Sequence, residues 1–526
     1  MEPTNPKTIT LTGSDLKTHD VAVLAYNHEA TVQIADSIKP ILQKSRKFLE
    51  NKVKEKIVYG VNTGFGPMAS HIISDSQLTH LQENLIRSHA VGIGASLDKK
   101  YVLAAMVVRL NTLIRGYSGI SLELAEHLQK FINHRITPVI PEHGAVGTSG
   151  DLTQLAHIAL ALMGEGEVMY KDERRPTKQV LQELHIQPYT LKSKEGIALI
   201  NGTSMMTGIA ALVSHEAHQL LSIAVRTTAL SLELVHAFDD GISKKLHDLR
   251  PHPGQVTVAA MLRDILSSSQ MLQQRNGLLH PHEKNGDVTK IPEVVQEIYS
   301  LRCSPQILGP VLDTLRKTTR EVEIEMNSVS DNPIVDWEND LFLHGGNFHG
   351  DYIATALDHL KMTLVKLTLL SDRRTNFFLN SQLNRFFPPF LNLKTPGLTL
   401  GLQGLQFVST STAAQSQSLA FPHSIHSIPT NADNQDIVSM GTDAAYFTTK
   451  VISNAYVVLT IELLTLAQAV DFLGEKEKLS NESKRVFGQV RSIFPAIQDD
   501  RTLVHELPQL VDFLKRDPGL KLSFPQ

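Results

Sequence analysis

The segment His143–Asp151, HGAVGTSGD, places one serine, Ser149, in a glycine-rich turn. A hydroxyl in such a turn can act as a nucleophile, bind a phosphate or hold the turn itself. A hydrolase nucleophile needs a G-x-S-x-G turn after a buried strand, but Asp151 replaces the second glycine and PVIPEHGAV is a poor strand. A phosphate-binding loop needs a lysine before its Ser or Thr, and this segment has none.

Two further interpretations of this turn remain open. Ser149 or Asp151 can cap a helix that begins at Leu152, because short polar side chains accept hydrogen bonds from the first free amides of a helix. Alternatively, the tripeptide Thr148-Ser149-Gly150 can cyclise when the glycine nitrogen attacks the Thr148 carbonyl carbon. Loss of two waters then yields a methylidene-imidazolone, an electrophile of a kind that no side chain supplies.

Several motifs accompany this tripeptide in order along the chain. They are YGVNTGFG, LIRSHAVGIG, VGTSGDL, LINGTSMMTG, YSLRCSPQILGP, SDNPIV with HGGNFHG, and HSIPTNADNQDIVSMG. With them the chain resembles the aromatic amino-acid ammonia-lyase and aminomutase family over roughly residues 10–510. The G-S-S-x-M-P loop of the related fumarase and argininosuccinate lyases is not found. The resemblance implies a fumarase/aspartase-like helical fold and a 4-methylidene-imidazol-5-one group formed from Thr148, Ser149 and Gly150, without a metal or a nucleotide.

The resemblance also implies catalytic roles. Tyr59 matches the base that removes a β-proton, an unusual task for a phenol, which normally ionises near pH 10. Asn201 matches an amide beside the prosthetic group, where it can donate to the ring oxygen as charge builds there. Tyr299 matches a second active-site tyrosine. The structural alternative for Tyr59 is an aromatic side chain that only packs its loop.

Other residues are expected to bind the substrate. Arg302 matches the partner of the substrate carboxylate, which arginine can bind through two parallel hydrogen bonds. Tyr299 precedes it by three residues, so the two share a helix face; a solvated helix face is the structural alternative for this segment. The remaining residues expected at the pocket are Gly66, His89, Leu152, Gln296, Phe348, Gln415, Asn434 and Gln435.

His89 is the position most informative about the substrate. A capping box of Ser74 and Gln77 predicts a helix start, and the stripe Leu78, Leu81, Leu85 predicts that His89 faces inward near the helix end. An inward imidazole suits a ring with a polar end, either a phenol or another imidazole. A buried, hydrogen-bonded core histidine is the structural alternative.

The sequence departs from the family at two positions. Thr148 stands where alanine is usual, and Gln415 stands where glutamate is usual. The neutral Gln415 weakens the case for histidine as substrate. The wider pattern, including VNTGFGPMA, LIRSHA, EGEVMYKDERRPT and NQDIVSMGT, resembles the bacterial tyrosine ammonia-lyases of the histidine-lyase type. The resemblance therefore implies conversion of L-tyrosine to p-coumarate and ammonia. The alternatives are a histidine ammonia-lyase that forms urocanate, an aromatic 2,3-aminomutase, and a silent helical scaffold.

The elements that must position these residues are mainly helical. Apolar residues recur at steps of three and four in DYIATALDHLKMTLVKLTLL, and the segments near Met205–Phe238 and Asp443–Leu473 are similarly long. Such helices usually bury their apolar stripe against other helices in a bundle. We expect an N-terminal prosthetic-group domain over residues 1–205 and a helical bundle domain over residues 206–526. The resemblance to the family implies assembly as a homotetramer.

Composition narrows the class of protein. The 526 residues carry a net charge of −4 and 20% charged residues, which predicts a soluble globular chain without a nucleic-acid-binding stripe. Cys303 is the single cysteine, which excludes an internal disulfide and favours a reducing, cytoplasmic compartment. The apolar segment AYVVLTIELLTLAQAV contains Glu462 and falls short of the ~18 uncharged residues of a membrane span. The expected partner is therefore a small aromatic amino acid.

Overall fold

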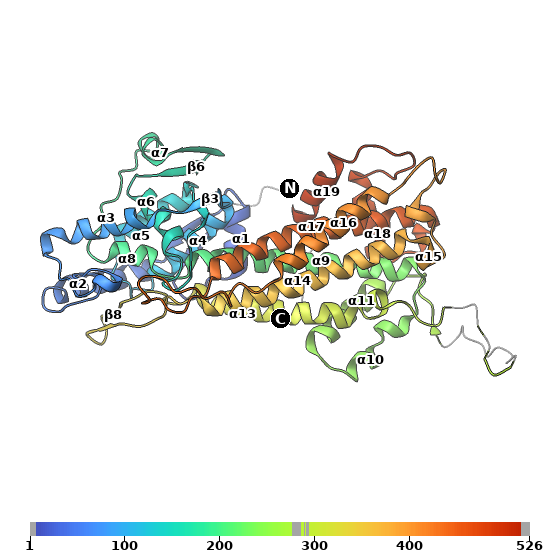
Figure 1. The fold of residues 1–526 in the computed structure, drawn as a ribbon, viewed down its shortest axis with the longest axis horizontal. Coiled ribbons are helices and arrows are strands. Elements are labelled where there is room, and N and C mark those ends of the chain that lie inside the picture. Colours follow the sequence, from blue (N-terminus) through green and yellow to red (C-terminus); the bar gives the residue numbers. More distant parts are fainter. Residues whose placement is uncertain (1–6, 276–285, 289, 291–293, 517–526) are drawn as a thin grey trace. The chain divides into compact units, whose positions relative to one another are not determined.

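The structure, a computed structural model, describes residues 7–275, 286–288, 290 and 294–516. The described chain is mainly helical, which confirms the predicted fold class (Figure 1). The helices are α1 (Thr18–Tyr26), α2 (Lys39–Lys52), α3 (Leu78–His89), α4 (Lys99–Leu113), α5 (Leu122–Asn133), α6 (Leu152–Leu162), α7 (Thr177–Glu183), α8 (Glu195–Ile200), α9 (Ser204–Leu234), α10 (Lys244–Asp248), α11 (Pro253–Leu266), α12 (Tyr299–Arg302), α13 (Ser304–Met326), α14 (Asp351–Leu379), α15 (Ser381–Asn384), α16 (Gln403–Leu419), α17 (Gly441–Leu473), α18 (Asn481–Ile493) and α19 (Glu506–Arg516).

The strands are short and form small sheets. They are β1 (Thr8–Leu11), β2 (Thr31–Ile34), β3 (Ile93–Ser96), β4 (Thr137–Pro138), β5 (Pro141–His143), β6 (Glu167–Tyr170), β7 (Glu173–Pro176), β8 (Ile334–Asp336) and β9 (Leu341–Leu343). Strands β1 and β2 pair in parallel, whereas β3–β5, β4–β6–β7 and β8–β9 are antiparallel. Strand β5 leads directly into the glycine-rich turn. Its pairing with β3 fixes where that turn begins.

The chain divides into two compact units, each built from three segments. Unit 1 comprises Met1–His215, Lys317–His359 and Pro422–Thr449, and unit 2 comprises Glu216–Arg316, Leu360–Phe421 and Lys450–Gln526. The long helices α9, α13, α14 and α17 contribute residues to both units. The expected division at residue 205 gives two domains that are each one continuous stretch of the sequence. Each unit of the structure is instead assembled from three separate stretches.

The core of unit 1 is centred on α4. From Tyr101 to Leu113 every residue of this helix is buried, the polar Arg109, Asn111 and Thr112 among them. Asp98 caps it by accepting a hydrogen bond from Lys100 N at 3.0 Å. The next helix, α5, is amphipathic and is capped by Ser121, which accepts from Leu124 N at 3.2 Å. These caps supply partners for amides that have none within the helix.

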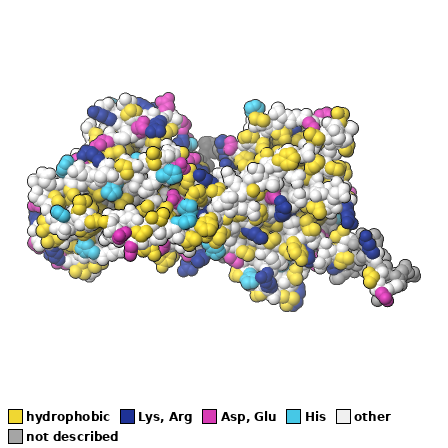
Figure 2. All heavy atoms as spheres, viewed as in Figure 1, with side chains coloured by type: hydrophobic (Ala, Val, Ile, Leu, Met, Phe, Trp, Pro, Cys, Tyr) yellow, Lys and Arg dark blue, Asp and Glu magenta, His cyan; other side chains and the backbone are white. Residues whose placement is uncertain are grey.

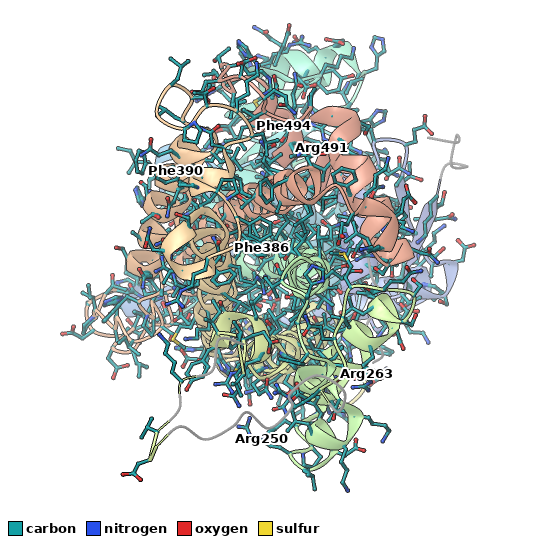
Figure 3. All side chains as sticks on the ribbon, turned by 90° about the vertical axis from the view of Figure 1, so that its right-hand side faces the viewer. Arg250, Arg263, Phe386, Phe390, Arg491 and Phe494 are labelled. Atoms are coloured by element: carbon teal, nitrogen blue, oxygen red, sulfur yellow. The ribbon has the colours of Figure 1, made fainter. Side chains whose placement is uncertain are left out.

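Unit 2 contains the larger part of each long helix predicted from the helical periodicity. The three long segments expected from the sequence are the helices α9, α14 and α17. Inside the bundle a fully buried Arg374 of α14 pairs with Glu462 of α17 and donates to Thr228 of α9 at 2.7 Å. Removal of either charged partner would leave a buried charge uncompensated. At the end of the unit shown in Figure 3, Arg491 Nη1 of α18 donates to the Phe494 carbonyl at 2.9 Å.

Helix α17 is long and apolar enough to cross a membrane by length and composition. However, 78% of its most apolar window is buried inside the protein, as expected of a core helix. On the face drawn in Figure 2, cationic and acidic side chains are interspersed with apolar ones.

A hairpin of β8 and β9 carries the only tryptophan of the chain, Trp337. Val335 N donates to the Tyr117 carbonyl at 2.7 Å, which fastens the hairpin to the loop after α4. Val335 is fully buried beside Leu49, Val58 and Val61 in a small apolar cluster. The Lys44 ammonium lies 5.8 Å from the Trp337 ring centroid. The hairpin is therefore an integral part of unit 1.

Candidate active site

The glycine-rich turn lies between β5 and α6 and packs closely against a second glycine. Gly150 has φ +70° and forms an isolated parallel bridge with Gly202. A Cβ atom at Gly150 would overlap the Gly202 carbonyl group, and one at Gly202 would overlap Arg109 and Ser330. Only glycine meets both the backbone angle and the spacing here.

Backbone hydrogen bonds fix the same turn from both sides. Gly202 N donates to the Ser149 carbonyl at 3.2 Å, and Asp151 N donates to the Gly202 carbonyl at 2.9 Å. The Gly147 carbonyl accepts from Gly350 N at 3.1 Å and from Ser439 Oγ at 3.0 Å. Residues far apart in the sequence thus hold the tripeptide in place.

Asp151 caps a helix, but not the one that follows it. No side-chain cap is present at the start of α6. Instead, the buried Asp151 carboxylate accepts hydrogen bonds from Met205 N and Met206 N, at 2.8 and 2.9 Å, in the first turn of α9. The alternative interpretation, in which Ser149 or Asp151 caps α6, is therefore wrong, because the tertiary fold brings α9 within reach of the Asp151 carboxylate. Burial raises the pKa of Asp151 to about 6.

The two hydroxyls of the tripeptide share one partner, Gln435. Thr148 Oγ1 donates to Gln435 Oε1 at 2.6 Å, and Gln435 Nε2 donates to Ser149 Oγ at 3.0 Å. Thr148 itself is only 3% exposed. The backbone of Gln435 is fixed in turn by a bridge with Thr430, with hydrogen bonds of 3.0 and 3.2 Å.

Tyr59 lies in the loop between α2 and α3. Its hydroxyl accepts a hydrogen bond from Gly66 N at 3.0 Å, and the Phe65 ring stands edge-on to it at 6.3 Å between centroids. Two contacts of different kind therefore orient the ring of the expected base.

His89 is the last residue of α3. Its Nδ1 lies 2.8 Å from the Leu85 carbonyl and 3.0 Å from Ser88 Oγ, which itself donates to that carbonyl. Because a carbonyl can only accept, Nδ1 carries the proton, and in the neutral ring Nε2 is a hydrogen-bond acceptor. The capping box expected at Ser74 does not form, because a 3₁₀ turn over Asp75–Gln77 precedes α3 and Ser74 makes no side-chain cap.

Asn201 ends α8 beside the glycine-rich turn. Its Nδ2 donates to the Asn332 carbonyl at 3.1 Å and to Asp331 Oδ1 at 3.4 Å. Asp331 also pairs with the fully buried Lys194 at 2.7 Å. In this structure it is Gly202 N, rather than the Asn201 amide, that donates to the Ser149 carbonyl.

These groups line one cavity of about 850 Å³ in unit 1, a volume within the ordinary range for a small-molecule site. The residues expected from the sequence that line it are Tyr59, Gly66, His89, Thr148, Ser149, Gly150, Leu152, Asn201, Phe348, Asn434 and Gln435. The described lining contains no lysine or arginine. Among the described residues, this chain therefore provides no lysine or arginine at the cavity for a substrate carboxylate.

Four expected site residues do not line this cavity and lie in unit 2: Gln296, Tyr299, Arg302 and Gln415. Tyr299 and Arg302 do share a helix face, because the guanidinium lies 4.7 Å from the Tyr299 ring centroid. The Tyr299 side chain is 70% exposed, and Arg302 Nε is buried without a hydrogen-bond partner. Gln415 Oε1 accepts from Asn454 Nδ2 at 3.0 Å.

Some lining residues were not predicted individually, although the motifs contain them. Phe65 belongs to YGVNTGFG, Asn332 to SDNPIV and His344 to HGGNFHG, whereas Thr430 and Asn431 belong to TNADNQD. Each motif predicted that its segment lies at the site. Which side chains within the segment face the cavity depends on the conformation of the loop.

The turn fits the prosthetic group that the family implies. Cyclisation requires the Gly150 nitrogen to approach the Thr148 carbonyl carbon, and the left-handed Gly150 without a Cβ permits such a turn. A hydrogen bond to the Ser149 carbonyl is already in place. The group would be held by the Thr148, Ser149 and Gly150 backbone and would supply an electrophile. Among the described residues, no group of three metal-binding side chains occurs.

Comparison with known proteins identifies the class of this chain. A family model described as "Aromatic amino acid lyase" matches residues 16–492. The chain is 39% identical to a histidine ammonia-lyase of Bacillus subtilis, covering 97% of each chain. Among solved structures it is similar to a tyrosine aminomutase of Streptomyces globisporus, with a TM-score of 0.94, 36% identity and 99% and 100% coverage. It is also similar to a histidine ammonia-lyase of Trypanosoma cruzi, with a TM-score of 0.86, 32% identity and 97% and 93% coverage.

The chain therefore belongs to the aromatic amino acid lyase family. Its fold is that of this family, of the fumarase/aspartase-like class, and its activity is that of an ammonia-lyase, a carbon–nitrogen lyase.

Proposed function

We propose that the protein deaminates an aromatic L-amino acid with a polar ring end, and that L-histidine, converted to urocanate and ammonia, is the first candidate. The observation that carries this proposal is the shared cavity of Tyr59, Ser149 and His89. Relatives 38–39% identical over nearly the whole chain are histidine ammonia-lyases, which supports histidine over the tyrosine expected from the sequence.

The roles of the residues follow from their chemistry. His89 Nε2 accepts a hydrogen bond from the polar end of the substrate ring, and Phe348 packs against that ring. Tyr59 removes a β-proton, a step in which a positioned base accelerates the reaction by about 10²–10⁴-fold. Thr148, Ser149 and Gly150 would hold the prosthetic group once cyclised, and the group would supply the electrophile that makes the amine a better leaving group.

L-Tyrosine is the second candidate, on two specific observations. Gln415 is a neutral amide, whereas a negative charge there would suit an imidazolium. A phenol O–H is also a donor that His89 Nε2 can accept. Likeness to an aminomutase adds a third outcome, a β-amino acid product.

The carboxylate of the substrate is bound by Arg302, which we assign to a neighbouring chain. The described lining of one chain's cavity has no cation, and Arg302 lies in the other unit of its own chain. A homotetramer in which neighbouring chains complete each site accounts for both facts. A cytoplasmic location remains a prediction from the single cysteine.

One experiment tests the substrate. The purified protein is offered L-histidine, L-tyrosine and L-phenylalanine in parallel, and the products are separated by chromatography while ammonia is measured. We expect urocanate to form fastest. Preferential p-coumarate formation would instead establish tyrosine, and β-amino acids without ammonia would establish an aminomutase. An intact mass without the loss of two waters in active protein would contradict the prosthetic group.

A further inference from the structure

Gln435 connects both hydroxyls of the tripeptide that the proposed function requires to cyclise. Its Oε1 accepts from Thr148 Oγ1 at 2.6 Å, and its Nε2 donates to Ser149 Oγ at 3.0 Å. The amide is planar, so a side chain held at its oxygen presents its nitrogen in a fixed direction. Both contacts lie within unit 1.

The Thr148 hydroxyl holds the oxygen end of this amide. It donates to Gln435 Oε1 at 2.6 Å, which leaves Nε2 as the end that faces Ser149 Oγ. Thr148 is 3% exposed, so water has little access to replace that contact. With the backbone of Gln435 bridged to Thr430, the side-chain amide has little freedom left.

Cyclisation comprises two dehydrations whose atoms can be followed. The first joins Gly150 N to the Thr148 carbonyl carbon and releases that carbonyl oxygen with the amide hydrogens of Ser149 and Gly150. The second breaks the Ser149 Cβ–Oγ and Cα–H bonds, leaves a Cα=Cβ double bond, and releases a water made of Oγ, its hydrogen and the Cα hydrogen. No oxidant or reductant is required.

We propose that Thr148 and Gln435 form a positioning pair for the second dehydration. As the Cβ–Oγ bond breaks, negative charge builds on Ser149 Oγ, and the Gln435 Nε2 donor stabilises it. Thr148 holds the amide so that this donor faces Oγ. The proposal gives the Thr148 hydroxyl a function at a position where alanine is usual in the family. It rests on the proposed function, because that function needs the cyclised tripeptide.

Three variants distinguish a positioning role of Thr148 and Gln435 from a role in packing alone. Thr148→Val keeps the shape of the side chain and removes the hydroxyl, whereas Thr148→Ser keeps the hydroxyl as the matched control. Gln435→Glu still accepts from Thr148, but its carboxylate cannot donate to Ser149 Oγ. Full-length chains are sampled at fixed times after synthesis, and intact mass with peptide mapping across residues 148–150 counts the waters lost. Circular dichroism and chain assembly serve as the folding control.

We expect wild type and Thr148→Ser to lose two waters at similar rates. Gln435→Glu should slow the second loss about 100-fold, so that chains missing one water accumulate. Thr148→Val should slow it about 10-fold, since the donor remains but is less well oriented. Folded variants that lose both waters at the wild-type rate would overturn the pair, and slowing in Gln435→Glu alone would overturn the part assigned to Thr148. A wild-type chain that keeps both waters would overturn the proposed function instead.

Discussion

At the residue scale, the proposed function assigns the choice of substrate ring to His89, a residue that lines the cavity. Its Nδ1 donates to the Leu85 carbonyl, which leaves Nε2 as the acceptor of the neutral ring. A substrate ring with a terminal O–H or N–H satisfies this acceptor, whereas a phenyl ring leaves it unpaired. An acceptor that a bound ring covers without pairing costs about 1–3 kcal/mol.

We therefore expect His89→Phe to shift the preference of the enzyme towards phenylalanine. The ratio of kcat/KM for phenylalanine to that for the preferred polar substrate should rise by about 10- to 100-fold. Steady-state kinetics on both substrates measures it. His80→Phe is the matched control, because His80 is an exposed residue of the same helix. An unchanged ratio in His89→Phe would remove His89 from substrate selection.

The sequence predicted much of the site at this scale. The residues Tyr59, His89, Ser149, Asn201 and Gln435 all line the cavity, because each lies in a motif whose loop closes on one place. The contacts of their polar atoms could not be predicted in the same way. The direction of the Asn201 amide and the bridge made by Gln435 depend on residues about 130 and 290 positions away.

At the scale of elements, periodicity predicted the long helices well. The segments near Met205–Phe238 and Asp443–Leu473 are α9 (Ser204–Leu234) and α17 (Gly441–Leu473). Helix caps were predicted less well. Asp151 lies one residue before α6 yet accepts from the amides of α9, since a buried carboxylate serves whichever free amides the fold brings close. Local sequence rules cannot anticipate such a long-range cap.

Helix α5 carries a buried histidine that makes unit 1 sensitive to acid. His127 Nε2 lies 3.3 Å from the Leu162 carbonyl of α6, and its ring packs against Phe131 and Tyr189. Burial lowers the pKa of His127 from 6.5 to about 4. As the pH falls below about 6.5, the unfolded chain binds a proton that the folded chain does not. The stability is therefore present above pH 6.5 and is lost as the pH falls towards 4.

We expect the free energy of unfolding to fall more steeply with acid in wild type than in His127→Gln. Between pH 7.5 and pH 5 the difference should be about 2 kcal/mol. Urea denaturation at the two pH values, followed by circular dichroism, measures it. His134→Gln, which changes an exposed histidine just after the same helix, should behave as wild type. Equal slopes for wild type and His127→Gln would show that His127 contributes nothing to acid sensitivity.

At the scale of the whole molecule, the site residues fall into two groups. The cavity residues all belong to unit 1, whereas Gln296, Tyr299, Arg302 and Gln415 belong to unit 2. The sequence resemblance predicted both groups as one site but could not indicate that no described lysine or arginine of the same chain lines the cavity. The two units are also discontinuous, because long helices pass through both of them.

If neighbouring chains complete each site, two inactive variants should restore activity together. Tyr59→Phe removes the proposed base and Arg302→Ala removes the proposed carboxylate partner, so each homotetramer alone should be inactive. Co-expression should combine one intact contribution from each chain in about one quarter of the sites. Turnover is compared with that of the two separately purified variants after mixing without subunit exchange. Activity no higher than their sum would place both residues in the same chain's site.

The hairpin of β8 and β9 makes unit 1 optically distinct. Trp337 is the only tryptophan in the chain, and it lies in unit 1, five residues after the cavity residue Asn332. Indole fluorescence therefore reports on unit 1 alone, whereas the helical signal in the far ultraviolet averages over both units. Comparing the two signals during denaturation distinguishes independent melting of the units from a single cooperative transition without any introduced label.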